Sequence, residues 1–265
     1  MSEAHIVVKD VNKVFSTPGR DVVALKDINL EVPRGQFVCL LGPSGCGKST
    51  LLNAIAGFAL PSSGTILADG QVVTAPGPER GMVFQEYALF PWMTVEDNVA
   101  FGLEIKNQPK AQIRATVDKL LQMLSLQDFR SRYPKDLSGG MRQRVAIARV
   151  LALDSPIMLM DEPFGALDAL TRRNLQDELL RLWAELKKTI IFVTHSIEEA
   201  IYLADRIVVM TYRPGTIKKD IVVDLPRLRD PAAAEFNALK RELGQLVMEE
   251  QQRHHNDELR MAAVD

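Results

Sequence analysis

The sequence has little of several features that define other protein classes. Among its 265 residues only Cys39 and Cys46 are cysteines, which excludes a disulfide framework and makes a reduced cytoplasmic protein the expectation. The formal net charge is −2, which argues against a general nucleic-acid-binding protein, because such proteins are usually strongly basic. No apolar run approaches the roughly 18 residues of a membrane-spanning helix, and residues 1–10 show no signal-peptide pattern.

The composition that remains is that of a globular protein with a sizeable core, 46% hydrophobic and 25% charged. The apolar residues gather in short continuous runs, which predict strands buried on both faces of a parallel sheet. The strongest runs span 36–41, 156–161, 189–195 and 206–210, and a weaker one spans 81–85. Between two of them, leucines recur at helical spacing, at Leu175, Leu179, Leu182 and Leu186. This alternation predicts an α/β core with helices on both faces.

Two regions depart from this alternation. Asp69-Gly70 between apolar runs predicts a β-hairpin over residues 65–73, which together with residues 6–15 predicts an antiparallel β region. Residues 87–150 lose their strand-like runs and take on helical patterning, which predicts a helical subdomain inserted into the α/β core.

The end of the chain predicts a docked helix. Asp230-Pro231 is a helix-start signal. The apolar residues that follow form one stripe, made by Phe236, Leu239, Leu243, Leu246 and Val247. Beyond Glu250 the composition becomes polar, which argues against order there.

The segment "GPSGCGKST" at residues 42–50 matches the phosphate-loop pattern G-x-x-x-x-G-K-[ST] between a predicted strand and a helix-compatible run. Its glycines let successive N–H groups face an anion, and the following helix adds its positive N-terminal end. Lys48 is placed to reach the β- and γ-phosphates, and the Ser49 hydroxyl to reach Mg²⁺. The predicted nucleotide-binding residues here are Gly42, Pro43, Ser44, Gly45, Cys46, Gly47, Lys48, Ser49 and Thr50.

Polar residues follow three of the predicted strands. Asp161 ends the apolar run 156–161 and suits Mg²⁺, and Glu162 is placed to polarise an attacking water. His195 ends another run, and we expect it to contact the γ-phosphate, because ligands bind at the carboxyl ends of parallel strands. Gln85 is an amide suited to Mg²⁺ or to orienting water. The alternative for Asp161 and Glu162 is a solvated acidic turn. For His195 it is a structural role, and for Gln85 it is a polar strand end.

A second glycine turn occurs in "DLSGGMRQRVAIARV" at residues 136–150. Ser138, Gly139 and Gly140 precede a run free of Gly and Pro, and a serine cap with bare backbone amides at a helix start can form an anion site. An ordinary helix N-cap is the alternative interpretation, and the residues alone favour it.

Together these motifs resemble the ATP-binding cassette (ABC) ATPases. "LSGGMRQR" is similar to their signature, "GPSGCGKST" to Walker A, "IMLMDE" to Walker B with its catalytic glutamate, and "GALD" to the D-loop. Gln85 is similar to the Q-loop glutamine and His195 to the switch histidine. Phe15 lies where the family carries an aromatic residue that stacks on adenine, with a core phenylalanine as the alternative. Ser196 departs from the family, in which many relatives have aspartate after the histidine.

The resemblance implies a fold and an assembly. It implies a P-loop NTPase (RecA-like) parallel-sheet core with an antiparallel β subdomain and an inserted helical subdomain. The ABC ATPase domain would span 1–228, with its helical subdomain at about 87–155, and a helical tail 229–265. Two copies would form a head-to-tail homodimer in which the signature turn of one copy covers the ATP held by the P-loop of the other.

The segments 89–99, 161–172 and 203–217 resemble the nitrate/sulfonate/taurine group of importer ATPases. This implies an ATP- and Mg²⁺-dependent subunit at the cytoplasmic face of the inner membrane. It would drive two permease subunits supplied by a periplasmic binding protein, with no nucleic-acid partner. We expect the permease to contact an apolar patch of Tyr87, Leu89, Phe90 and Trp92, although each could be a core residue. The alternatives are an exporter or lipid-extraction ATPase and a soluble ABC ATPase.

Overall fold

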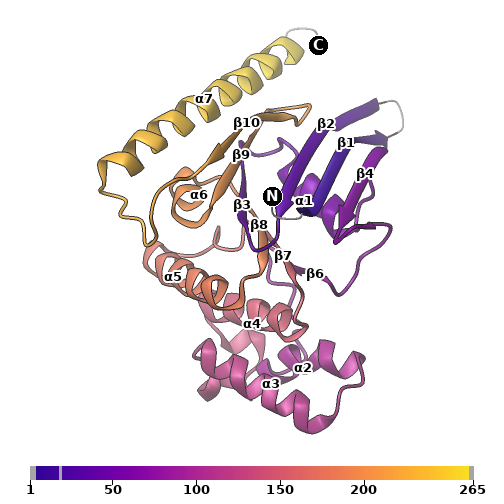
Figure 1. Cartoon of the computed structure of the whole chain (residues 1–265), viewed down its shortest axis with the longest axis vertical. Coiled ribbons are helices and arrows are strands. Elements are labelled where there is room, and N and C mark those ends of the chain that lie inside the picture. Colours follow the sequence, from indigo (N-terminus) through magenta and orange to yellow (C-terminus); the bar gives the residue numbers. More distant parts are fainter. Residues whose placement is uncertain (1–3, 18–19, 263–265) are drawn as a thin grey trace. The chain divides into compact units, whose positions relative to one another are not determined.

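The computed structural model describes residues 4–17 and 20–262. The chain divides into two compact units, one formed by residues 1–76 with 189–265 and the other by residues 77–188. Figure 1 shows the elements of both units. Across the described residues, no helix has both the length and the apolarity that crossing a membrane requires.

The first unit is built on a sheet whose central strand carries the phosphate loop. β3 (Phe37–Leu41) lies between β8 (Thr189–Thr194) and β9 (Arg206–Met210) and pairs in parallel with both. β10 (Ile217–Val222) adds an antiparallel edge to β9. All residues of β3 and β8 are buried, which confirms the prediction that continuous apolar runs here form doubly covered strands.

An antiparallel sheet forms the rest of this unit's β structure, in the order β2-β1-β4-β5. Its strands are β1 (Ala4–Thr17), β2 (Arg20–Pro33), β4 (Ser63–Ala68) and β5 (Gln71–Val72). Asp69 and Gly70 both have positive φ, 51° and 72°, as the predicted tight hairpin requires. The sequence prediction omitted β2 and β10, whose polar residues break the apolar pattern.

Among the residues that the structure describes, the helices of this unit are α1 (Lys48–Ala56), α6 (Ile197–Leu203) and α7 (Ala234–Ala262). Figure 1 shows α7, in yellow, running beside β9 and β10. Phe236, Leu243 and Val247 are buried, so the predicted docking of this helix is confirmed. The expectation that order ends near Glu250 is wrong, because the helix continues to Ala262 and buries Glu250 itself.

The second unit combines two parallel strands with helices. β6 (Arg80–Val83) pairs in parallel with β7 (Ile157–Asp161), and both strands overlap the apolar runs that predicted them. The helices are α2 (Val95–Ile105), α3 (Lys110–Met123), α4 (Gly139–Ala152) and α5 (Ala169–Leu186), with 3₁₀ turns at Gln127–Phe129 and Pro134–Asp136. The elements between β6 and β7 are thus helical, as predicted, whereas the boundaries of the ATPase domain, subdomain and tail stay predictions.

Candidate functional site

The phosphate loop, residues 42–47, joins β3 to α1 in the first unit. Gly45 and Gly47 have φ values of 78° and 97°, in the left-handed region that side chains rarely adopt. A Cβ at Gly47 would also lie 2.8 Å from Cδ2 of Leu25. Gly47 is therefore required by both backbone conformation and close packing, and Gly45 by its backbone conformation.

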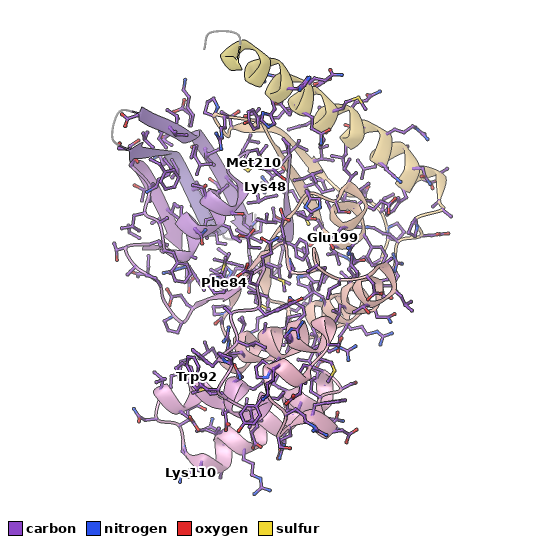
Figure 2. All side chains as sticks on the ribbon, turned by 180° about the vertical axis from the view of Figure 1, so that it is seen from behind. Lys48, Phe84, Trp92, Lys110, Glu199 and Met210 are labelled. Atoms are coloured by element: carbon purple, nitrogen blue, oxygen red, sulfur yellow. The ribbon has the colours of Figure 1, made fainter. Side chains whose placement is uncertain are left out.

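Lys48 opens α1 and is almost fully buried, with 4% of its surface exposed. Its Nζ donates hydrogen bonds to the carbonyl oxygens of Gly42 at 2.8 Å and Pro43 at 2.9 Å, so the ammonium is held against the loop that it follows. Figure 2 labels Lys48 within the first unit. A positive charge fixed inside a glycine loop at a helix N-terminus is an arrangement that binds phosphate.

Cys46 lies inside the same loop and is fully buried. Burial raises the pKa of its thiol, and this outweighs the lowering effect of the neighbouring Lys48. The residue is therefore a protonated thiol at neutral pH, and its poor thiolate content makes it a weak nucleophile.

His195 and Ser196 follow β8 in this unit, and the His195 side chain is exposed. Ser196 is the N-cap of α6: its Oγ accepts from the Glu199 N–H at 3.3 Å, and its own N–H donates to Oγ1 of Thr194 at 3.0 Å. The serine thus performs the capping task that an aspartate performs at such a position, and the helix after the histidine keeps its start.

Phe15 lies near the end of β1 with 44% of its surface exposed, and Lys13 Nζ lies 5.1 Å from its ring centre. The interpretation of Phe15 as a core residue is therefore wrong. An exposed ring remains available to stack on a flat ligand, and its role with adenine stays a prediction.

In the second unit, Asp161 ends β7 and Glu162 follows it with φ of 43°. A non-glycine residue in this region carries backbone strain, which is common where a side chain is held for function. The loop beyond Glu162 is fastened by Arg172, which donates to the carbonyl oxygens of Phe164 at 3.2 Å and Leu167 at 2.7 Å. No sequence pattern marks Arg172 as a site residue, because its partners are backbone atoms.

The acidic loop ends where α5 begins. Asp168 caps that helix by accepting from the Thr171 N–H at 3.0 Å, and the bonds from Thr171 hold the pKa of Asp168 below its ordinary value. Gln85 lies beyond β6 in the same unit, with its side chain exposed. The strand ends predicted to carry polar site residues therefore do so in both units.

The signature turn forms the start of α4. Ser138 is the N-cap, and its Oγ accepts from the Met141 N–H at 3.3 Å. Gly139 and Gly140 take the first two helical positions, whose N–H groups have no acceptor within the helix. A Cβ at Gly140 would lie 2.6 Å from Cγ2 of Thr171, so packing against α5 requires this glycine. Both interpretations of the turn, helix cap and anion site, are compatible with this geometry.

A sequence profile of the family described as "ABC transporter" matches residues 25–165. The chain belongs to the ABC transporter family. It is 48% identical to a nitrate import ATP-binding protein of Synechocystis, over 90% of each chain, and 52% identical to a taurine import ATP-binding protein of Roseobacter denitrificans, over 80% of each. A solved dimeric ATP-binding cassette bound to ADP and phosphate superimposes with a TM-score of 0.74 at 33% identity, covering 83% of this chain and all of that one.

This ABC protein carries the predicted apolar patch on the segment after Gln85. Trp92 is 71% exposed, whereas Tyr87, Leu89 and Phe90 are partly buried. Phe90 packs on Phe101 with ring centres 4.6 Å apart and on Trp92 at 5.7 Å. Figure 2 shows Trp92 on the helical part of this unit. The patch is therefore a partly exposed surface, and Phe90 packs it onto Phe101 of α2.

Two residues that the sequence analysis missed hold this patch in the ABC protein. Asn98 is fully buried, accepts from the Phe90 N–H at 2.9 Å, and donates to the carbonyl oxygens of Phe90, Met93 and Thr94. Arg149 of α4 donates to the carbonyl oxygens of Ala88 and Tyr87 at 2.7 and 3.3 Å. Asn98 could have been noticed in the sequence as a polar residue between the apolar Val95 and Val99. Arg149 has no such signal, because an arginine is an ordinary residue on a helix.

Proposed function

We propose that this ABC ATPase is the energy-coupling subunit of a bacterial importer for nitrate, a sulfonate, taurine or a related small solute. The ATPase assignment rests on one observation above the others: Lys48 is buried and fixed by hydrogen bonds to its own glycine loop at the start of α1. The import assignment is supported by relatives about half identical in sequence that are named for import of these solutes.

The chemistry assigned to this chain is attack of water on the γ-phosphorus of ATP. In this proposal Glu162 accepts a proton from that water, and the bond between the γ-phosphorus and the β-γ bridging oxygen breaks to leave ADP and phosphate. Lys48 binds the β- and γ-phosphates, and His195 stabilises charge on the transferring phosphoryl group. Gln85 orients the water, and Phe15 stacks on the adenine.

The residues assigned to Mg²⁺ are Ser49, Gln85 and Asp161. They offer hydroxyl, amide and carboxylate oxygens, the ligand types that Mg²⁺ prefers, and Ser49 and Gln85 are exposed. The set therefore fits the ion, and Mg²⁺ would neutralise charge on the phosphates when bound.

We propose that the working form is a head-to-tail homodimer. The amides of Gly139 and Gly140 and the Ser138 cap would then cover the ATP held by the partner copy. A helix N-terminus attracts an anion without a charged side chain, so it can release the product once the dimer opens. Hydrolysis would follow closure, because the site is complete only in the closed dimer.

The patch of Tyr87, Leu89, Phe90 and Trp92 is assigned to the permease subunits. A partly exposed aromatic cluster suits the apolar face of a docked helix. Binding there would place the protein peripherally on the cytoplasmic face of the inner membrane, with a periplasmic protein delivering the solute to the permease.

The nucleotide assignment is tested with Lys48→Met, which keeps the length of the apolar stem but removes the ammonium. Loss of a charge-assisted contact costs about 2 kcal/mol, so we expect ATP binding to weaken roughly 30-fold. The measurement is titration with ATP by calorimetry, with a thermal melt to show that the variant is folded. Wild-type affinity in a folded Lys48→Met variant would contradict the P-loop assignment.

The permease assignment is tested with Trp92→Ala. Because Trp92 is largely exposed, we expect its removal to change the free energy of unfolding by less than about 0.5 kcal/mol. A tryptophan at the centre of an interface contributes about 2 kcal/mol, so binding to the purified permease pair should weaken roughly 30-fold.

Ile105→Ala is the matched control, since Ile105 is 68% exposed in the same unit but lies outside the patch. Equal binding by Trp92→Ala and the control would remove the patch from the interface. A large loss of thermal stability in Trp92→Ala would instead show that the indole is structural.

A further inference from the structure

A closed turn at residues 211–216, between β9 and β10, lies between the phosphate loop and the C-terminal helix. Thr211 fastens it: its N–H donates to the Thr216 carbonyl oxygen at 2.9 Å, and its Oγ1 bonds to the Pro214 carbonyl oxygen and the Thr216 N–H, both at 2.8 Å. These hydrogen bonds tie the two ends of the turn to each other.

One side of this turn packs against the phosphate loop. The Gly215 N–H donates to the Ala24 carbonyl oxygen at 2.9 Å, and its own carbonyl accepts from the Lys26 N–H at 3.0 Å. A Cβ at Gly215 would lie 2.2 Å from the carbonyl oxygen of Cys46, so the two backbones are in direct contact. Arg213 Nε also donates to the carbonyl oxygen of Gly45 at 3.4 Å.

The other side of the turn is bound by α7. The Tyr212 N–H donates to Oε2 of Glu250 at 3.0 Å, and the Tyr212 ring stacks on His254 with ring centres 3.9 Å apart. Glu250 and His254 are four residues apart and so share one face of the helix. α7 therefore contacts the residue that directly precedes Arg213.

Glu250 is held in this position as an ion. Its side chain is 1% exposed, and Lys218 Nζ donates to its Oε1 at 2.7 Å. Burial alone would raise the pKa of this carboxyl, but the bonds from Lys218 and the Tyr212 N–H outweigh burial and hold the pKa below its ordinary value. A buried, paired carboxylate is costly to displace, so the link from the helix to the turn is specific.

We propose that α7 positions the phosphate loop for ATP through the 211–216 turn, which makes Glu250 and His254 positioning residues for the ATPase reaction. This inference rests on the proposed role of the phosphate loop. If the loop samples its binding-competent shape only part of the time, apparent affinity falls by that fraction, whereas turnover at saturating ATP does not. Loosening the helix should therefore raise KM for ATP and spare kcat.

The test compares full-length variants by steady-state ATP hydrolysis. Glu250→Ala should raise KM about 5-fold with kcat within about 2-fold of wild type. Glu249→Ala is the matched control, because Glu249 also bonds to Lys218 but is 62% exposed and makes no contact with Tyr212 among those described. An equal rise in KM for both variants, or none for a folded Glu250→Ala, would overturn the proposal.

His254 gives an independent comparison if Glu250→Ala does not fold. His254→Ala removes the stacked ring and should raise KM, whereas His254→Phe keeps a ring on Tyr212 and should restore it. A merely structural role would lower the melting temperature without separating KM from kcat. Wild-type KM in His254→Ala overturns the link. Lys48→Met is measured in parallel to test the phosphate loop itself. If Lys48→Met loses ATP binding while the α7 variants keep the wild-type KM, the role of the phosphate loop stands and only the role of α7 is refuted.

Discussion

Replacing Glu162 by glutamine should lower kcat for ATP hydrolysis by roughly 100-fold or more, with ATP binding close to wild type. Removing a general base costs about 10²- to 10⁴-fold in rate. Glutamine has the same length and can occupy the same backbone conformation with φ of 43°, so the loop after β7 should keep its shape. The bound ATP then persists, and we expect the variant to accumulate as a dimer.

The measurements are single-turnover hydrolysis, ATP titration and analytical ultracentrifugation with ATP present. Glu185→Gln is the control, because it makes the same charge change on the exposed surface of α5 in the same unit. Hydrolysis by Glu162→Gln at the wild-type rate would remove Glu162 from its proposed role. Lost ATP binding in the same variant would instead show that Glu162 acts in binding.

Replacing Ser138 by arginine should abolish hydrolysis while the same chain still binds ATP. Ser138 is exposed, so we expect a larger side chain to be accommodated there, with the lost N-cap costing about 1 kcal/mol of stability. In the proposed dimer, however, this position faces the partner's ATP, and a bulky side chain there would prevent closure.

Ser138→Ala separates the two effects, because it removes the cap hydroxyl without adding bulk. We expect it to lose stability comparable to Ser138→Arg but to keep ATP-dependent dimerisation, measured by light scattering, and most of its hydrolysis. Dimerisation of Ser138→Arg with ATP at the wild-type concentration dependence would contradict the proposed interface and leave the turn as an ordinary helix cap.

The sequence predicted those parts of the fold that depend on neighbours along the chain. Continuous apolar runs located β3, β7, β8 and β9, because a strand covered on both faces has no polar alternation. β2 and β10 lie at sheet edges and include polar residues, so continuous apolarity did not predict them. The same reasoning ended α7 too early, because Glu250 is polar in sequence but buried against Lys218 and the Tyr212 N–H.

The candidate site likewise contains residues that the sequence predicts and residues that it does not. Glycine spacing, the lysine and the polar strand ends are local patterns, and the sequence found each of them. The residues that fasten the site, Arg172, Asn98 and Arg149, bond to backbone carbonyl oxygens, and backbone acceptors are present at every residue. No residue type in the sequence marks which carbonyl will be used.

The sequence by itself therefore determined a phosphate-binding loop and, through the resemblance of its ordered motifs, the ABC ATPase family, because these motifs are short segments whose order and spacing are visible in one dimension. Only the tertiary structure decided that the 211–216 turn lies against the phosphate loop and that Tyr212 meets Glu250, 38 residues further along the chain. Contacts between distant segments depend on how the whole chain packs, and their energies are set by burial and geometry that no local pattern encodes.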